Sequence, residues 1–246
     1  MKYLFLISWL RAREKKLVDS VDIDRMISVT SVEESFKVLN DTDYAPFISG
    51  ESHKTIDNVI EKERNDLRNS LYLMDIEREA VDILFLRDEF SKISKEVKQD
   101  LFKRKEKQKG LSEKKKDSDI IKEIKERSPN NPHEIDEILD EIYFERMISF
   151  LEKSKEKEMA DFFRRYEENI KNNKKSDKLL RDDILKDLED EIIEEESKQS
   201  DGFLPVLAFF IKKRRAEYLI KTILSAKRIG IDVKDIHNLT NKVRTI

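Results

Sequence analysis

The sequence predicts an all-α protein, and three observations support this fold class. The chain has only 4 glycines and 4 prolines among its 246 residues, so few positions interrupt a helix. Charged residues make up 42% of the chain and are rich in Lys and Glu, which favour long helices. Apolar residues recur at steps of three and four over most of the chain, whereas the alternation typical of strands is nowhere sustained.

The composition argues against several classes of protein. The formal net charge is −3, from 50 basic and 53 acidic side chains, whereas dedicated nucleic-acid-binding proteins usually have a basic excess. The absence of Cys excludes disulfides, thiolate zinc sites and a cysteine nucleophile, and it fits a cytoplasmic location. No apolar run approaches the ~20 residues that a membrane-spanning helix needs.

Residues 2–18 are predicted to form the first helix. Its first ten residues resemble the apolar core of a signal peptide, but a basic segment, residues 11–16, follows directly and no small-residue cleavage site comes after it. We therefore favour a buried helix over a signal peptide. The expected apolar stripe comprises Tyr3, Leu6, Ile7, Leu10 and Leu17.

A capping box begins the next predicted helix. The Ser31 hydroxyl can accept a hydrogen bond from the N–H of Glu34, whose carboxylate can accept one from the N–H of Ser31. The helix is expected to bury three apolar side chains, Val32, Phe36 and Leu39. The corner that follows holds candidate caps for the next turn, Asp41, Thr42 and Asp43. Two aromatic residues are predicted to anchor this corner, Tyr44 and Phe47.

Two helices are predicted over residues 55–74 and 76–102. The second carries apolar residues at steps of three and four through its length: Ile83, Leu86, Phe90, Ile93, Val97 and Leu101. From 103 to 131 large apolar side chains are sparse and prolines follow, so we predict a linker with one short helix at 120–124. Its basic part, 103–116, can also be interpreted as a contact for anionic lipid headgroups, although a flexible linker is favoured.

Further helices are predicted over residues 134–152, 155–171 and 177–196, followed by the longest apolar one over 203–231. A helix that is apolar nearly all round belongs in an interior, so we expect the other helices to pack around this one. Pro205 suits its first turn, and Gly230 suits a left-handed residue after its last turn.

Two polar residues near the C-terminal end have predicted structural roles. Glu217 lies inside the apolar helix, where it is expected to pair with Arg214 or Lys221, one turn to either side. Asp232 is predicted to cap a final short helix. Together these elements predict four parts: a first helical lobe over 1–102, a charged linker over 103–133, a second lobe over 134–200 and a C-terminal lobe over 201–246.

Three blocks of the sequence carry a recognisable pattern. The first is the basic segment Arg11–Leu17 followed by Ser31–Tyr44, which ends in Leu-Asn-Asp-Thr-Asp-Tyr. The second is the helix 138–147 followed by the aromatic segment 162–170. The third is the apolar helix after a proline, with Glu217, Lys227 and Gly230. In order and spacing these blocks resemble the C-type (also called d-type) subunit family of V-type and archaeal-type ATPases, and the first block is the most specific.

The resemblance implies both a fold and a function. Family members consist of three related helical lobes arranged as a funnel, and weak repeats occur here at 85–88, 166–169 and 216–218. The shorter stretches at 103–133 and 172–200 imply that the second and third lobes are truncated. The family protein is a non-catalytic adaptor on the cytoplasmic face of the membrane. It links the rotating shaft to the proteolipid ring during proton or sodium transport.

Six residues of the first block are candidates for a partner interface: Arg11, Arg13, Lys15, Asp41, Asp43 and Tyr44. The cations can bind an acidic partner, although a solvated helix face with local ion pairs is the more common role. The two aspartates can bind a cation, but capping fits better because no further oxygen ligands cluster nearby. The histidines lie far apart without metal-ligand spacing, so we expect no metal, cofactor or catalytic residue.

Two other functions stay open. A cytoplasmic helical interaction scaffold unrelated to rotary ATPases would have the same composition. A structure in which residues 1–100 form an extended rod would favour this scaffold. A structure in which those residues fold back onto the last long helix would favour the ATPase subunit. RNA binding through the basic segment 103–116 is the second alternative, and it would weaken steeply with salt. That segment contains no aromatic residue that could stack on bases.

Overall fold

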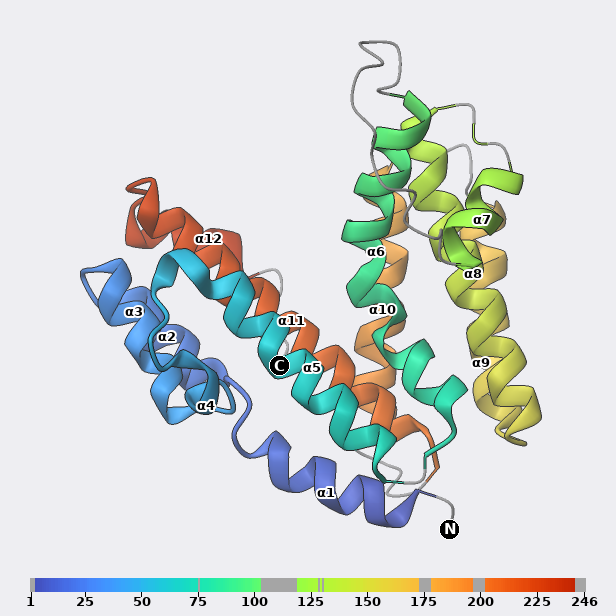
Figure 1. The fold of residues 1–246 in the computed structure, drawn as a ribbon, viewed down its shortest axis with the longest axis horizontal. Helices are drawn as coiled ribbons and strands as arrows, with labels where there is room; N and C mark the ends of the chain where they lie inside the picture. The colour runs from blue at the N-terminus through green and yellow to red at the C-terminus, as the bar shows by residue number, and fades with distance from the viewer. Residues whose placement is uncertain are drawn as a thin grey trace, which may run out of the picture. The chain divides into compact units, whose positions relative to one another are not determined.

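The computed structural model describes residues 3–74, 76–102, 119–127, 129, 131–172, 178–196 and 202–241. Throughout these residues the secondary structure is helical and no strand occurs, which confirms the all-α prediction (Figure 1). The chain divides into two compact units: unit 1 is Met1–Glu77 with Lys178–Ile246, and unit 2 is Arg78–Asp177. No helix in the described ranges is long and apolar enough to cross a membrane.

Unit 1 is built from both ends of the chain. Its helices are α1 (Leu4–Glu14), α2 (Ser20–Ser28), α3 (Val32–Val38), η1 (Leu39–Asp41), α4 (Ala45–Ile48), η2 (His53–Thr55), α5 (Ile56–Tyr72), α10 (Lys178–Glu196), α11 (Leu204–Arg228) and α12 (Val233–Asn241). Unit 2 is continuous, with α6 (Arg78–Phe102), α7 (Asp119–Glu126), α8 (Pro132–Lys153) and α9 (Lys157–Asn172).

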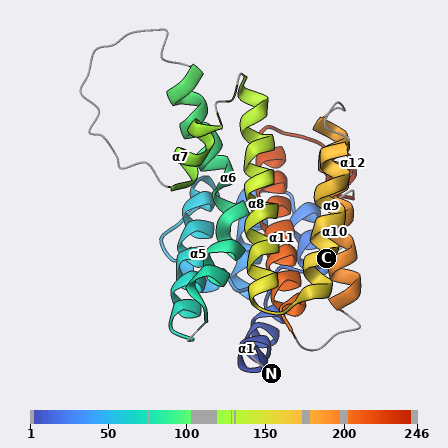
Figure 2. The same cartoon turned by 90° about the vertical axis from the view of Figure 1, so that its right-hand side faces the viewer.

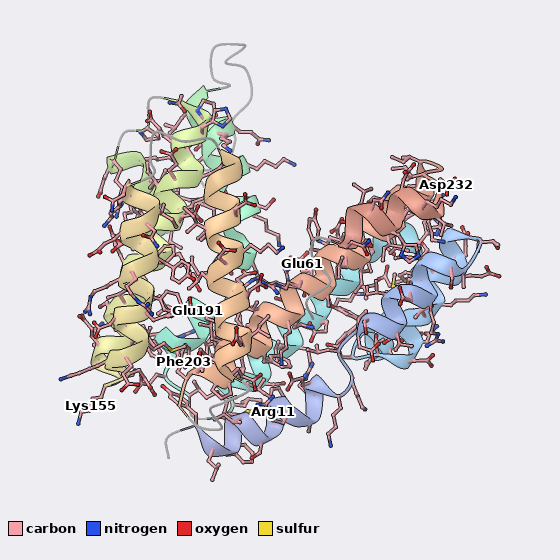
Figure 3. The ribbon with its side chains drawn as sticks, turned by 180° about the vertical axis from the view of Figure 1, so that it is seen from behind. Arg11, Glu61, Lys155, Glu191, Phe203 and Asp232 are labelled. Carbon is pink, nitrogen blue, oxygen red and sulfur yellow. The ribbon has the colours of Figure 1, made fainter. Side chains whose placement is uncertain are left out.

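The apolar helix α11 is the centre of unit 1. It packs against α1, α2, α3, α10 and α12. Its first half is buried on nearly every side, whereas Tyr218 and Ser225 are exposed in its second half. Figure 3 shows Arg11 on α1 and Phe203 at the start of α11 at the same end of the unit, where the Phe203 ring lies 5.6 Å from that of Tyr3. The prediction that other helices surround α11 therefore holds within unit 1.

The end of α11 follows the predicted chemistry. Gly230 has a φ of +78°, which a residue with a side chain rarely adopts. Its N–H bonds the Lys227 carbonyl at 3.1 Å, and the N–H of Ile231 bonds that of Ala226 at 2.9 Å, which completes a Schellman motif. Asp232 then caps α12, because its Oδ1 accepts a hydrogen bond from the N–H of Lys234 at 3.0 Å.

Unit 2 packs around α8. Figure 2 shows α6 running beside α8, and α9 turns back along α8 after Lys155. Isoleucines of α6, α7 and α8 form one part of its core. An aromatic cluster forms another, in which the rings of Tyr143, Phe144 and Phe163 lie 5.8 to 6.3 Å apart.

The boundaries of the units differ from those of the four predicted parts. Helix α6, assigned to the first lobe from the sequence, packs with α7 and α8 in unit 2. Helix α10, assigned to the second lobe, packs on α11 in unit 1. An apolar stripe predicts that a helix has a buried face, but it does not specify which helix covers that face.

Other differences concern single elements. Helix α2 was not predicted, although Asp19 and Asp22 form a capping box at its start and Ile23, Met26 and Ile27 are fully buried. Leu101, part of the apolar stripe predicted for residues 76–102, is 40% exposed. The predicted short helix at 120–124 is present as α7. The basic stretch 103–116 lies outside the described residues.

Candidate functional site: the charged waist of α11

The centre of α11 combines burial with a high density of charge. Lys212, Lys213, Arg214, Arg215 and Glu217 lie between two apolar halves of the helix, and we call them the charged waist. Lys213, Arg215 and Glu217 are only 3 to 5% exposed. Because a buried charge is costly unless it is paired, each of these side chains needs a partner of opposite sign.

Lys213 is bound by two carboxylates from different elements. Its Nζ lies 2.9 Å from Oδ2 of Asp43, in the corner between η1 and α4, and 2.6 Å from Oε2 of Glu63 on α5. The ammonium also lies 4.8 Å from the centre of the Tyr44 ring, within range for a cation–π interaction. Arg13 of α1 donates to the other oxygen of Glu63 at 2.9 Å, so two cations and two carboxylates balance inside the unit.

Glu217 has a partner that the sequence analysis did not identify. Arg64 of α5 donates through Nε to Oε1 of Glu217 at 3.2 Å and through Nη2 to Oε2. This two-point contact fixes the plane of both groups. The candidates predicted from the sequence pair elsewhere: Arg214 with Glu189, and Lys221 with Asp57. Helical spacing identifies neighbours on the same helix, whereas this carboxylate binds an arginine of α5.

The remaining cations of the waist bind α10 and α1. Lys212 donates to Glu14 of α1 and to Glu196 of α10. Glu196 also accepts from Arg11 of α1. Arg215 lies 3.3 Å from Glu189 and 2.7 Å from Asp190, both on α10. The waist therefore connects α11 by ion pairs to α1, α5, α10 and the η1–α4 corner.

Burial and charge act together on the protonation of this network. Burial raises the pKa of Glu63 against the attraction of Lys213, and the carboxylates of Asp43 and Glu217 raise it further. For Lys213 burial favours the neutral amine, but Glu63, Asp43 and Glu217 together raise its pKa above the ordinary lysine value. Burial, with the same carboxylates nearby, raises the pKa of Tyr44 well above that of a free tyrosine. At neutral pH Lys213 is therefore charged and Tyr44 is neutral.

The six candidate interface residues separate into two groups. Arg13, Asp43 and Tyr44 belong to the network around Lys213, where their side chains stabilise the interior of unit 1. Three others reach the surface: Arg11, Lys15 and Asp41. Arg11 pairs with Glu14 and Glu196, and Asp41 pairs with Arg25 at 3.1 Å. A partner interface at these three residues stays a prediction.

The expected capping of the next helix by Asp41, Thr42 or Asp43 is wrong, because Tyr44 is the N-cap of α4 and no side-chain hydrogen bond caps that helix. Thr42 instead makes local hydrogen bonds within the corner. Its hydroxyl donates to the Leu39 carbonyl at 2.8 Å and accepts from the N–H of Tyr44 at 3.3 Å. Asp41 and Asp43 instead form ion pairs with arginine and lysine from other helices. A carboxylate that can reach a lysine or arginine of another helix often binds that cation and not a nearby backbone N–H, because a charge-assisted hydrogen bond is stronger.

A second lysine of α11 has a role that the sequence analysis missed. Lys227 donates to the carbonyls of Ile27, at 2.9 Å, and Val29, which end α2. Its cation therefore binds the negative end of that helix. Lysines and arginines within a helix that is apolar all round were the available signal for Lys213 and Lys227, since such charges require buried partners.

No group of three or more metal-binding side chains occurs within the described ranges. His53 lies near a carboxylate, 3.4 Å from Glu33. No family model matches the sequence, and no curated protein matches it.

Proposed function

We propose that this protein is a central-stalk adaptor of a V/A-type rotary ATPase or ATP synthase, similar to the C-type (d-type) subunit family. In this role it links the rotating shaft to the membrane proteolipid ring during proton or sodium transport, as a peripheral protein on the cytoplasmic face. The second and third helical lobes of the family are then truncated in this chain.

The observation that carries the proposal is the contact between the first and third blocks of the resemblance. Asp43 and Tyr44 of the first block contact Lys213, and the Glu217 of the third block contributes to the same electrostatic cluster. Lys227 of the third block binds the end of α2, which leads into the capping box at Ser31. Residues that resemble one family at both ends of the chain are thus packing partners in one unit.

The second block supports the proposal in the same way. Its two segments lie on α8 and α9, and Tyr143 from the first segment contacts Phe163 from the second, with ring centres 6.3 Å apart. All three blocks therefore supply core contacts, as expected when a resemblance reflects a shared fold.

The packing of the N-terminal helices favours an adaptor over an extended rod. Helices α1, α2 and α3 all pack on α11, so the first part of the chain folds back onto the last long helix. Densely packed helices resist deformation, which suits a body that transmits torque.

The test is association with the rotary complex in the native membrane. An affinity-tagged chain should co-purify with the shaft and proteolipid proteins, and deletion of its gene should abolish ATP-driven ion pumping. Intact pumping in the deletion strain, or purification without either partner, would contradict the proposal and favour the unrelated scaffold.

Surface variants sharpen this test. Lys15→Glu and Asp41→Lys reverse exposed charges of the first block and should weaken co-purification without unfolding unit 1. Lys54→Glu reverses an exposed charge on η2, outside the first block, and is the matched control. Equal loss with all three variants would indicate a general charge effect and not an interface at the predicted residues.

A further inference from the structure

Apolar contacts alone do not fix the orientation of a helix segment that is apolar on every side. Apolar contacts are non-directional, so an apolar cylinder can be buried equally well after rotation about its axis or a shift along it. The first apolar half of α11 is of this kind, because Val206, Leu207, Phe209 and Phe210 are all buried. The second half buries Leu219, Ile220, Ile223 and Leu224 but exposes Tyr218 and Ser225. The apolar contacts of the first half favour burial of α11 but discriminate weakly between orientations, and those of the second half allow a shift by one turn.

The charged waist provides the direction that the first apolar half lacks. Consecutive residues of a helix point about 100° apart, so Lys212, Lys213, Arg214 and Arg215 together cover most of its circumference. Lys212 reaches α1 and α10, Lys213 reaches α5 and the η1–α4 corner, and Arg215 reaches α10. Rotation by one residue would separate all of these buried cations from their carboxylates at once.

We propose that the charged waist fixes the rotation and axial register of α11 within unit 1, with Lys213 and Glu217 as the principal positioning residues. Lys213 is held by Asp43 and Glu63, and Glu217 by both nitrogens of the Arg64 fork. A shift of one turn would displace each pair by about 5.4 Å, far beyond hydrogen-bond distance. The inference concerns the fold of unit 1 and does not depend on the proposed function.

This role is distinct from a contribution to stability. Replacing buried ion pairs by apolar residues of similar volume is often neutral or stabilising, because the cost of desolvating the charges disappears. A waist that sets register therefore predicts an unusual combination: complete apolar replacement keeps the unit folded, but α11 loses its single orientation.

The experiment replaces the Lys213 centre and measures the position of α11. The variant is Asp43→Leu, Glu63→Met and Lys213→Met combined in the full chain. Because the chain has no Cys, spin labels attach only at introduced cysteines. Exposed Ser225 on α11 and exposed Lys37 on α3, a helix that contacts α11, provide the pair of sites.

The wild-type background should give one narrow distance between the labels. The apolar variant should keep the wild-type helical circular dichroism and melt cooperatively, but its distance distribution should broaden or gain a peak displaced by about 5 Å, one helical turn. Restoring Lys213 and Glu63 while keeping Asp43→Leu should restore the narrow distance. The control Glu51→Gln with Lys62→Gln removes an exposed ion pair of unit 1 and should leave the distance unchanged.

A second variant covers the other end of the waist. Arg64→Met with Glu217→Met removes the second pair and should broaden the distance in the same way. A folded apolar variant of either kind with one narrow wild-type distance would overturn the inference. So would the unfolding of both apolar variants, because the waist would then be needed for stability itself.

Discussion

Unit 1 holds a network of paired charges at its centre, whereas the centre of unit 2 is mainly aromatic and aliphatic, with Asp140 and Ser94 as its buried polar side chains among the described residues. In unit 1, Lys213 and Glu63 are almost completely buried. In unit 2, Lys98 and Asp136 pair at 2.9 Å but are 30% and 28% exposed, and Arg127 contacts three carboxylates on the flank of α7 and α8. Loss of one partner therefore leaves a buried charge in unit 1 and a hydrated one in unit 2.

The two units also differ in how far their contacts reach along the sequence. The pairs Arg64–Glu217 and Asp43–Lys213 join residues 153 and 170 positions apart. Lys98 and Asp136 are 38 positions apart. Unit 1 is thus stabilised by directional contacts between distant segments, and unit 2 by contacts within one continuous segment.

The largest expected effect is that of Lys213→Met. It leaves Asp43 and Glu63 facing each other without their shared cation, so the free energy of unfolding of unit 1 should fall by about 3–5 kcal/mol. Trp9 is the single tryptophan of the chain and lies in unit 1 with the Arg13 guanidinium 5.0 Å from its ring, so its fluorescence during urea unfolding reports this unit.

Lys98→Met is the matched control in unit 2. Its partly exposed partner Asp136 stays hydrated, so the cost should be below about 1 kcal/mol, measured by hydrogen exchange of α6 and α8 peptides. Equal effects of the two lysine substitutions would remove the electrostatic distinction between the units.

The apolar centre of unit 2 is tested by Met147→Ala. Met147 is fully buried on α8, so its truncation should cost about 2–5 kcal/mol through lost burial and a cavity. Hydrogen exchange of α8 and α9 should accelerate accordingly. Met159→Ala removes a half-buried methionine of α9 and should cost clearly less; a comparable cost at both sites would argue against a core centred on α8.

The turns that end α8 and α11 provide a smaller, paired test. Both are Schellman motifs, but the left-handed position is Gly230 in one and Lys155, with φ +66°, in the other. Nothing lies within 4 Å of a Cβ built on Gly230, so Gly230→Ala should cost about 1–2 kcal/mol through backbone strain alone. Lys155→Gly should stabilise unit 2 by about 1 kcal/mol, and a loss of thermal stability would contradict this.

The smallest effect at neutral pH is expected for Tyr44→Phe. The buried Tyr44 hydroxyl has no hydrogen-bond partner within the described ranges, so its removal should change the free energy of unfolding by less than about 1 kcal/mol at pH 8. The variant becomes informative at alkaline pH, where this hydroxyl titrates in the unfolded chain.

The sign of the alkaline effect follows from the raised pKa values of Tyr44 and Lys213. Above about pH 10 the unfolded chain releases these protons while the folded unit keeps them, so the free energy of unfolding falls as the pH rises. Tyr44→Phe removes one of the two contributions and should make this fall less steep, measured by urea unfolding followed through Trp9. Tyr218→Phe, which removes an exposed hydroxyl from α11, is the control, and parallel curves for Tyr44→Phe and wild type would contradict the burial argument.

The sequence predicted local features well. The stripe in residues 2–18, the capping box at Ser31 and the left-handed Gly230 each depend on neighbours within a few positions, and all three are present. Helix α2 was missed although its Asp19–Asp22 capping box is equally local.

The partners of buried charges could not be predicted in the same way. Glu217 requires a cation, but Arg64 was one of many arginines and lysines in a chain with 50 basic residues. The assignment of α6 and α10 to units failed for the same reason, because amphipathic stripes on different helices are interchangeable until the tertiary packing is known.

The division of unit 1 between the two ends of the chain has a consequence for synthesis. Helices α1 to α5 leave the ribosome before α11, and all of unit 2 is translated in between. At about 5–20 residues per second, α11 is completed roughly 10–40 seconds after α3, and until then the apolar faces of α1, α2 and α3 lack the helix that covers them. During that interval these exposed apolar faces can bind a chaperone.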